Sequence, residues 1–404
     1  YVTAWYRMAA EYMAGTRMVT AFVSTNSISQ GEQPGISWNE LFGRWSIRIH
    51  FAHRTFVWES EARGKAHVHC VIIGFAAYDC ASKWIFDDET GTGDATVTAA
   101  KNISPYLIEG PNLALPNISK PICQVPEMGI GNKPIDGGNY LFSTEEKNAF
   151  VRAEPASAKW FRKWIGSDEF INGWHRWCLW LGECPPNELR AMPNAMARIE
   201  AVRKFRLASK SAPTQKLAAT PTRFHVENFP SRSFLVVPKV SSERRPFIPI
   251  GFMAPKNLCS DLVFIVSNAK PFHFGVLSST MHMAWMRQVA GRLKSDYRYS
   301  TGLVYNNFPW PDSATDGQRL KVEDCARAVL AAREQFVGST LADLYDPRTM
   351  PPALAKAHAA LDRAVERCYR KEPFATDRQR VEFLFCRYEQ LTAPLALSGK
   401  QKRK

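Results

Sequence analysis

Hydrophobic residues at the start of the chain follow first a helical and then a strand-like spacing. Apolar positions recur every three or four residues over residues 1–14 and predict an amphipathic helix. Residues 18–25 are an apolar, β-branched run and predict a strand that leads into a polar loop. Helix, strand and polar loop in succession form the repeating unit of an open α/β sheet. Because ligands of such sheets bind beyond the carboxyl ends of the strands, the loop offers Asn26, Ser27 and Gln30 as candidate site residues.

Three further segments extend this first region. Residues 36–44 predict a short helix, 46–56 a strand of alternating character, and 66–75 a nearly continuous apolar strand. The polar turn between the two strands indicates an antiparallel pair at the edge of the sheet. So few elements do not close a doubly wound domain, and we expect the first half of the sheet to lie outside this chain. Tyr1 already stands within a helical pattern, as in a fragment of a longer protein.

The middle of the chain is rich in Gly, Pro, Asn and Asp, which favour loops. Residues 143–181 then predict helical structure with Ser143 or Thr144 as its cap, and 185–211 predict a basic helix broken at Pro193. The basic side chains of this second helix form either a candidate face for a nucleic-acid backbone or an ordinary solvated surface. These side chains are Arg198, Arg203, Lys204, Arg206 and Lys210.

Residues 223–308 alternate strand-like runs, one of them at 273–279, with a helix at 280–295, and predict a mixed α/β module. Three segments with helical spacing follow and predict a C-terminal helical region. The last residues, 396–404, form a basic tail.

Composition adds a partner and a compartment to this picture. Lys and Arg outnumber Asp and Glu by 52 to 38, and the net charge of +14 creates a field that suits a polyanionic partner, nucleic acid first. A basic surface that serves only solubility explains the charge equally well. Nine cysteines without a C-x-x-C pair argue against zinc and thioredoxin motifs. His53, His67 and His69 could suggest a metal cluster, but His67 and His69 share one strand face with no third ligand at suitable spacing, so cross-strand packing explains them better. No apolar run reaches the roughly 20 residues of a bilayer span. We therefore expect a cytoplasmic protein with no metal and no membrane partner.

Several segments resemble the MmeI-like (type IIL) restriction-modification family, in which one polypeptide joins an adenine methyltransferase to a target-recognition domain. The segments are YVTAWY at 1–6, FVSTNSISQGEQ at 22–33, IHFAHRTFVWESEARGKAHVHCVIIGF at 49–75, GIGNKPIDGGNYL at 129–141 and SDYRYSTGLVYNNFPWP at 295–311, with EFINGWHRWCLWL, RPFIPIGFM and LADLYDP besides. Their order and spacing argue against chance agreement. The resemblance implies an α/β protein with a partial class I (Rossmann-like) methyltransferase sheet, then an α+β target-recognition domain and a C-terminal helical region.

The same resemblance suggests the domain boundaries. Residues 1–77 would be the end of the methyltransferase catalytic domain, 78–315 the target-recognition domain, 316–395 the C-terminal helical domain and 396–404 the tail.

For the activity, the resemblance implies transfer of a methyl group from S-adenosyl-L-methionine to N6 of an adenine flipped out of double-stranded DNA, in a restriction-modification or phage-defence system. Family members hold the cofactor with a glycine-containing strand-to-helix loop and the target amine with an Asn-Pro-Pro-Phe tetrapeptide. This chain contains neither, so we expect both to precede Tyr1 and the isolated chain to be inactive. The alternative is a non-catalytic, sequence-specific DNA-binding module.

An adenine amine is methylated outside the duplex, which requires a stacking wall for the extruded base. The resemblance places Phe56 at that wall, with Trp58 as the alternative. Without the resemblance, a buried core phenylalanine would be the expected reading. Asn26, Ser27 and Gln30 line the base and cofactor cleft by the same resemblance, although turn chemistry alone also explains Asn and Ser in such a loop.

Lys294 and Asp296 correspond to a specificity-determining pair of the family. Lys donates to guanine and Asp accepts from cytosine, so the two would read one G·C pair from an extended segment in which both point to the same side. An exposed ion pair is the alternative.

Contacts to the DNA backbone are expected elsewhere, because they position a protein without specifying sequence. Lys133 would neutralise a phosphate beside the GNKPIDGG loop while Asp136 braces the turn, unless the loop is purely structural. Arg244 and Arg245, in a predicted turn between strands, would clamp the backbone, against the alternative of surface solubility. Further phosphate or sugar contacts are expected from Arg292, Tyr297, Arg298 and Tyr299.

Overall fold

The computed structural model describes residues 1–58, 68–88 and 94–400, so His67 lies outside the described residues. The chain folds into two compact units. The first comprises residues 1–125, 279–318 and 362–404, and the second comprises 126–278 and 319–361.

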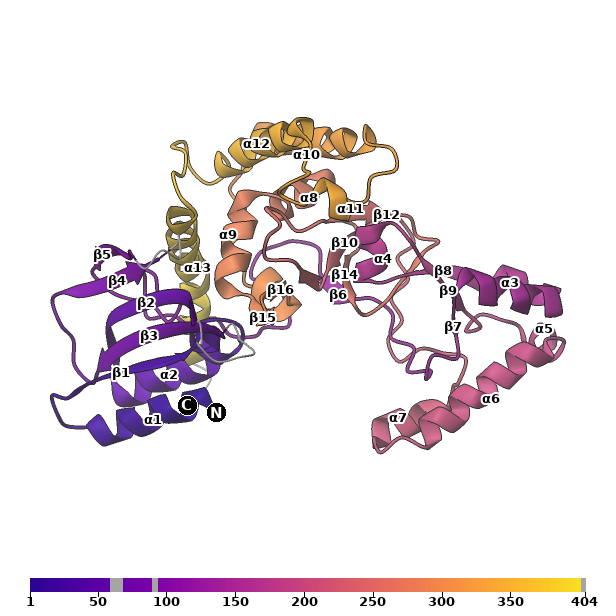
Figure 1. The fold of residues 1–404 in the computed structure, drawn as a ribbon, viewed down its shortest axis with the longest axis horizontal. Helices are drawn as coiled ribbons and strands as arrows, with labels where there is room; N and C mark the ends of the chain where they lie inside the picture. The colour runs from indigo at the N-terminus through magenta and orange to yellow at the C-terminus, as the bar shows by residue number, and fades with distance from the viewer. Residues whose placement is uncertain (59–67, 89–93, 401–404) are drawn as a thin grey trace. The chain divides into compact units, whose positions relative to one another are not determined.

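The first unit is built on a five-stranded sheet in the order β1-β3-β2-β4-β5 (Figure 1). Its strands are β1 (Val19–Thr25), β2 (Arg48–Trp58), β3 (Val68–Ala76), β4 (Lys83–Asp87) and β5 (Thr96–Ala100). Strand β3 runs antiparallel to both β1 and β2, while β4 runs parallel to β2. The predicted strands and the antiparallel β2–β3 pair are confirmed, but the pair lies in the middle of the described sheet and not at its edge. The expected domain boundary at residue 77 falls within this sheet, since β4 and β5 continue it.

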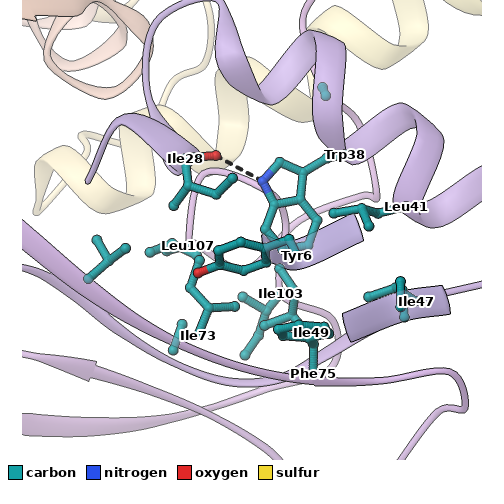
Figure 2. Close-up of a cluster of buried hydrophobic side chains, with 14 of the residues drawn as sticks. Tyr6, Ile28, Trp38, Leu41, Ile47, Ile49, Ile73, Phe75, Ile103 and Leu107 are labelled. Atoms are coloured by element: carbon teal, nitrogen blue, oxygen red, sulfur yellow. Dashed lines mark hydrogen bonds between the residues drawn. The ribbon is translucent and has the colours of Figure 1, made fainter. Parts of the chain in front are cut away.

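Two helices, α1 (Val2–Met13) and α2 (Gln33–Trp45), pack against each other and on one face of the sheet. The ring of Tyr6 stacks on Phe75 with centroids 5.2 Å apart, and Trp38 lies edge-on to Tyr6 at 5.8 Å (Figure 2). The indole N–H of Trp38 donates a 2.8 Å hydrogen bond to the carbonyl of Ile28, inside the 3-10 turn η1 (Asn26–Ser29) that follows β1. The hydrophobic core therefore fixes the backbone of the candidate loop directly.

The remaining elements of the first unit come from later in the chain. Helix α9 (Thr280–Val289) packs beside α13 (Asp377–Lys400) (Figure 1). A short hairpin of β15 (Gly291–Leu293) and β16 (Asp296–Arg298) follows α9, and a π-helical turn, η4 (Thr301–Tyr305), comes next. The predicted helix over 280–295 is thus too long, because the chain turns into the hairpin after α9.

The second unit contains two four-stranded sheets, ordered β12-β10-β14-β6 and β13-β8-β9-β7. The first sheet consists of β6 (Met128–Ile130), β10 (Phe234–Pro238), β12 (Gly251–Met253) and β14 (Val263–Val266). The second consists of β7 (Leu141–Phe142), β8 (Phe161–Ile165), β9 (Arg176–Leu179) and β13 (Leu258–Cys259). A further short strand, β11, spans Val240–Ser241.

The helices of the second unit confirm some predictions and correct others. Ser143 caps α3 (Thr144–Ala153) with a full capping box, and Pro193 begins α6 (Pro193–Leu207) after the short α5 (Pro186–Arg190). The all-helical prediction for 143–181 is wrong, because β8 and β9 flank the short helix α4 (Ser167–Asn172). The other helices and turns are η2 (Pro155–Trp160), α7 (Ala212–Lys216), η3 (Leu217–Ala219), α8 (Pro271–Leu277) and α11 (Leu341–Leu344), with most of α10 (Asp316–Glu334) and α12 (Pro352–Glu366).

Helix α8 occupies the run over 273–279 that the sequence predicts as a strand, so that prediction is wrong. The helix packs closely: a Cβ atom on Gly275 would lie 2.8 Å from Val322 of α10 and 3.2 Å from Leu361 of α12. The LADLYDP segment belongs to the same helical layer. Its Tyr345 hydroxyl accepts a 2.8 Å hydrogen bond from Nε of Arg333 and lies 2.8 Å from Nε2 of the buried His358. The predicted C-terminal helices are therefore confirmed, and a buried polar network through Tyr345 joins α10 to α12.

Candidate functional site

An open cavity of about 1240 Å³ lies within the first unit. The end of β2, the end of β4 and the residues after η1 form one part of its wall. Helix α9, the β15–β16 hairpin and the start of α13 contribute another part, and His69 of β3 with Tyr106 and Leu107 after β5 line it as well. Segments far apart in the sequence therefore meet around one space, and four of the candidate residues line it. These are Gln30, Phe56, Arg292 and Tyr297.

A β-bulge shapes the wall formed by β2. His53 pairs with Ile72 and Phe56 with Cys70, so three steps along β2 match two steps along β3 and one residue of β2 is extra. Bulges redirect side chains and occur often beside active sites. Here the four successive residues 54–57 all line the cavity, where a regular strand would turn every second one away.

Phe56 is half-buried at this wall and lies outside the core cluster of the unit. Its ring centroid is 6.3 Å from that of Trp58, whose side chain is 51% exposed and does not line the cavity. Burial raises the pKa of the Cys70 thiol opposite Phe56 on β3. The thiol therefore stays protonated near neutral pH, and the aromatic ring faces the cavity beside a neutral neighbour.

The loop after β1 places its candidate residues differently. Ser29 and Gln30 line the cavity, whereas the hydroxyl of Ser27 lies 2.9 Å from Oγ1 of Thr25 and Asn26 Nδ2 donates to Gln30 Oε1 at 3.3 Å. Asn26 and Ser27 thus make local loop contacts, in the manner of the turn-chemistry alternative. Among the three candidates, Gln30 is the one that the structure places at the cavity.

Charged side chains line the cavity in pairs. Arg54 on β2 forms an ion pair with Asp87 at the end of β4. Its Nη2 group also lies 3.4 Å from Oε1 of Gln288, whose own Nε2 donates a 2.7 Å hydrogen bond to the carbonyl of Tyr106. Across the space, Arg287 of α9 pairs with Asp377 of α13 at 2.8 Å. Fixed pairs of this kind hold guanidinium groups in defined directions.

Arg54, Asp87 and Gln288 were missed as candidates by the sequence reasoning. The available signal was weak: Arg54 stands two residues before Phe56 in the HRTF segment. Gln288 and Asp87 carry no local signal, because only the tertiary structure brings them together. Desolvation lowers the pKa of neighbouring His53, whose ring stacks on Phe86 with centroids 4.4 Å apart, so this histidine adds no positive charge at pH 7.

The hairpin carries the candidate base-reading pair in an unexpected geometry. Lys294 is exposed at the tip with a φ of 58°, because Leu293 pairs with Asp296 and leaves Lys294 and Ser295 as a two-residue turn. The expected strand-like arrangement of Lys294 and Asp296 is therefore wrong. Arg298 is exposed on β16, so both basic side chains are accessible on this hairpin.

Two tyrosines of the segment are buried. Tyr297 is 7% exposed and carries the guanidinium of Arg292 over its ring at 3.9 Å. Tyr299 is 3% exposed, and its hydroxyl lies 2.9 Å from Nε2 of His282 in the interior. The phosphate contact expected of Tyr299 is therefore wrong, since its hydroxyl is occupied inside the fold.

In the second unit, Asp136 is buried and its carboxylate accepts hydrogen bonds from the backbone N–H groups of Gly138 at 3.2 Å and Tyr140 at 2.8 Å. This is the bracing role expected of it, and burial removes the carboxylate from contact with DNA. Lys133 is exposed beside the turn. Arg244 is exposed and Arg245 half-buried in the turn after β11, as predicted.

One basic residue of α6 does not belong to a surface. Arg206 is fully buried, and its guanidinium donates five hydrogen bonds of 2.8–3.0 Å to backbone carbonyls. These carbonyls belong to Pro134, Ile135, Leu217, Thr220 and Arg223. Its inclusion in a candidate backbone-binding face is therefore wrong.

Within the described ranges, no three His, Cys, Asp or Glu side chains are placed to hold a metal ion, and no helix is long and apolar enough to cross a membrane.

Comparisons with known proteins match three successive stretches of the chain to three domains of one family. The sequence models of the MmeI DNA-methyltransferase domain, target recognition domain and C-terminal domain match residues 1–87, 109–312 and 314–396. DNA methyltransferase A of Bacillus subtilis (strain 168) is 42% identical over 393 residues, which cover 97% of this chain and 44% of that protein. The type IIL restriction-modification enzyme MmeI, solved in complex with DNA, is 47% identical with a TM-score of 0.88, over 97% of this chain and 52% of that chain.

Fold and matches together place the chain in the class of proteins that join a DNA-methyltransferase domain to a target recognition domain. Within that class, the chain belongs to the MmeI family. The family resemblance and the fold class expected from the sequence are both confirmed. The chain spans about half the length of the relatives that it matches.

Proposed function

We propose that this chain acts within a site-specific DNA methyltransferase that transfers a methyl group from S-adenosyl-L-methionine to N6 of an adenine flipped out of double-stranded DNA. The observation that carries the proposal is the cavity, where the methyltransferase-matched segment at residues 1–87 supplies Phe56 and the recognition-matched segment at 109–312 supplies α9 and the hairpin. A cleft built jointly by a catalytic and a reading segment suits an enzyme that modifies one base of a recognised sequence.

In this proposal Phe56 stacks on the extruded adenine. Base extrusion costs a few kcal/mol of lost stacking, and an aromatic wall returns part of that cost. The half-buried ring at the bulge and the open volume beside it support this role. Gln30 lies at the same cavity and is placed to offer an amide to the base or to the cofactor.

S-adenosyl-L-methionine supplies an electrophilic methyl group when bound. Because neither the glycine-containing loop nor the Asn-Pro-Pro-Phe tetrapeptide occurs in the sequence, most of the cofactor site would lie outside this chain. This chain contributes the stacking wall, the loop after β1 and the groups that hold the DNA.

DNA reading is assigned to exposed groups of both units. Lys294 at the hairpin tip is accessible to a base edge, with Asp296 next to it. Arg292, which stacks on Tyr297, and the exposed Arg298, Lys133, Arg244 and half-buried Arg245 are candidates for backbone contacts. The chain's net charge of +14 favours such contacts.

Two variants of the full-length protein test the central role of Phe56. Phe56→Ala should slow single-turnover methyl transfer more than it weakens DNA binding, and it should reduce the fluorescence increase of 2-aminopurine placed at the target adenine. Trp58→Ala is the matched control, because Trp58 is a neighbouring aromatic residue that does not line the cavity. An unchanged rate for Phe56→Ala would return Phe56 to a packing role.

A second candidate is a DNA-specificity module without activity of its own, favoured by the target recognition match over 109–312 and by the missing catalytic motifs. The isolated 404-residue chain distinguishes the two. Sequence-specific binding without methyl transfer by this chain, together with methyl transfer by the full-length protein, fits the first proposal. Binding without methyl transfer by either protein supports the module alone.

A further inference from the structure

The wall that carries Phe56 also carries an arginine held by two partners. Arg54 lies at the start of the bulge, two residues before Phe56, and both side chains line the same cavity. Asp87 pairs with its Nη1 group and Gln288 with its Nη2 group. The Arg54 and Asp87 side chains are 25% and 20% exposed, so the pair borders the cavity and is not sealed within the core.

The partners of Arg54 are themselves fixed. Gln288 is 9% exposed, and its Nε2 group is anchored on the Tyr106 carbonyl at 2.7 Å. Asp87 is the last residue of β4, and the residue before it, Phe86, pairs with His53 of β2 in the sheet. The guanidinium is thereby held between the sheet and α9, and its direction does not depend on a bound ligand.

A guanidinium carries five N–H donors, and the hydrogen bonds to Asp87 and Gln288 use one on each Nη group. Among the residues that the structure describes, Asp87 and Gln288 are the partners of this guanidinium, and its remaining donors lie at the border of the cavity. Arginine donates to phosphate oxygens in a planar, charge-assisted arrangement, and a carboxylate behind it orients the group without using that edge. An ion pair that only stabilises the fold could lie anywhere in the unit. The position of this pair on the cavity wall, next to Phe56, instead favours a role in binding.

We propose that Arg54 is a phosphate-binding residue that holds the phosphodiester next to the extruded adenine, with Asp87 and Gln288 as its positioning residues. This inference rests on the proposed function. The bulge serves both tasks, because it turns Arg54 and Phe56 toward the same cavity. Arg54 then fixes the sugar-phosphate backbone of the nucleotide whose base lies against Phe56.

The test combines a protein change with a DNA change. On native DNA, Arg54→Ala in the full-length protein should raise the dissociation constant about 10-fold and reduce the salt dependence of binding by about one phosphate contact. Uncharged methylphosphonate linkages are then placed one at a time around the target adenine. For the unaltered protein, one position should weaken binding and slow methylation by a similar factor, and Arg54→Ala should be insensitive at that position alone.

Three controls distinguish a lost phosphate contact from a general loss of folding or charge. Arg44→Ala removes another ion-paired arginine of the same unit that lies outside the cavity, and it should keep the full response to methylphosphonate. Arg54→Lys retains the charge without the planar fork and should recover part of the affinity. The methylphosphonate effect on the unaltered protein does not depend on whether any variant folds.

The phosphate contact would be overturned if, at every linkage, the factor by which methylphosphonate weakens binding were the same for Arg54→Ala as for the unaltered protein. It would also be overturned if no neutral linkage weakened binding by the unaltered protein. Either result leaves the methyltransferase proposal standing if the unaltered protein methylates adenine. An unaltered protein that transfers no methyl group to DNA would instead remove the proposed function.

Discussion

The backbone N–H of Gly31 donates a 3.1 Å hydrogen bond to the carbonyl of Val289, the last residue of α9. The two backbones cross closely here, since a Cβ atom on Gly31 would lie 3.2 Å from Cα of Gly291. The loop after β1 is thus joined to the start of the β15–β16 hairpin. In the proposed enzyme, this link fixes the distance between the cleft loop and the exposed Lys294.

Gly31→Ala should weaken this link. Gly31 has a φ of 68°, a left-handed conformation that costs a residue with a side chain about 1–2 kcal/mol. We expect the free energy of unfolding in urea to fall by about that amount. Gly43→Ala is the control, because Gly43 lies in α2 with open space around its Cα, and alanine there should raise helix stability by about 0.5–1 kcal/mol. Equal effects at the two glycines would contradict the close crossing.

Trp38→Phe should destabilise the first unit by more than the lost ring volume. The substitution leaves the buried carbonyl of Ile28 without the indole donor, and an unsatisfied buried acceptor costs about 1–3 kcal/mol. Trp45→Phe makes a matched comparison, since among the described residues the indole nitrogen of Trp45 has no hydrogen-bond partner. Urea unfolding should show the larger loss for Trp38→Phe, and a larger loss for Trp45→Phe would argue against the role of the hydrogen bond.

The buried carboxyl of Asp362 should make the free energy of unfolding depend on pH. Desolvation raises the pKa of its carboxyl to about 7, above the ordinary 3.8, while a hydrogen bond from the Thr280 backbone N–H opposes the shift. A raised pKa in the folded state contributes stability that is complete at low pH and lost as the pH rises through 7. Relative to the unaltered protein, Asp362→Asn should therefore gain stability between pH 6 and pH 8.

Asp343→Asn provides the contrast, because hydrogen bonds from Thr340 lower the pKa of Asp343 and leave this carboxylate charged throughout that interval. Urea unfolding of both variants at pH 6, 7 and 8 gives the comparison. An Asp362→Asn difference that does not change with pH would show that Asp362 is ionised throughout.

Lys294→Ala should relax the DNA preference at one base pair. A lost bidentate base contact costs about 1–3 kcal/mol on the preferred sequence and little on others. Lys133→Ala should instead weaken binding to all sequences alike, because a phosphate contact carries no sequence information. Competition binding with single-base variants of the recognised sequence measures both. Uniform weakening by Lys294→Ala would place Lys294 among the backbone contacts.

The sequence predicted the first unit well where one period dominated. The helical spacing of α1 and the apolar runs of β1 and β3 each match a single type of element, and the structure confirms all three. Short apolar runs were ambiguous. Strand β8 and helix α8 are both brief and rich in large apolar residues, so periodicity alone does not distinguish them, although Pro271 at the first turn of α8 was a usable signal.

The parts of the site that escaped prediction depend on contacts distant in sequence. Arg54 meets Gln288, which lies in α9, and Arg206 is buried by carbonyls from separate segments of the chain. Lys294 lies in a tight turn although the sequence before it continues a helical pattern. No local pattern reports such contacts, because they exist only once the chain has folded.

We have proposed that this chain belongs to an enzyme that methylates adenine at one recognised DNA sequence. The most direct measurement is single-molecule sequencing of genomic DNA from a host that expresses the complete reading frame, with Phe56→Ala expressed in parallel. We predict N6-methyladenine at one fixed position of a single sequence motif, at reduced occupancy in the Phe56→Ala strain. Unmodified adenines at every motif, or methylation on cytosine instead, would contradict the account.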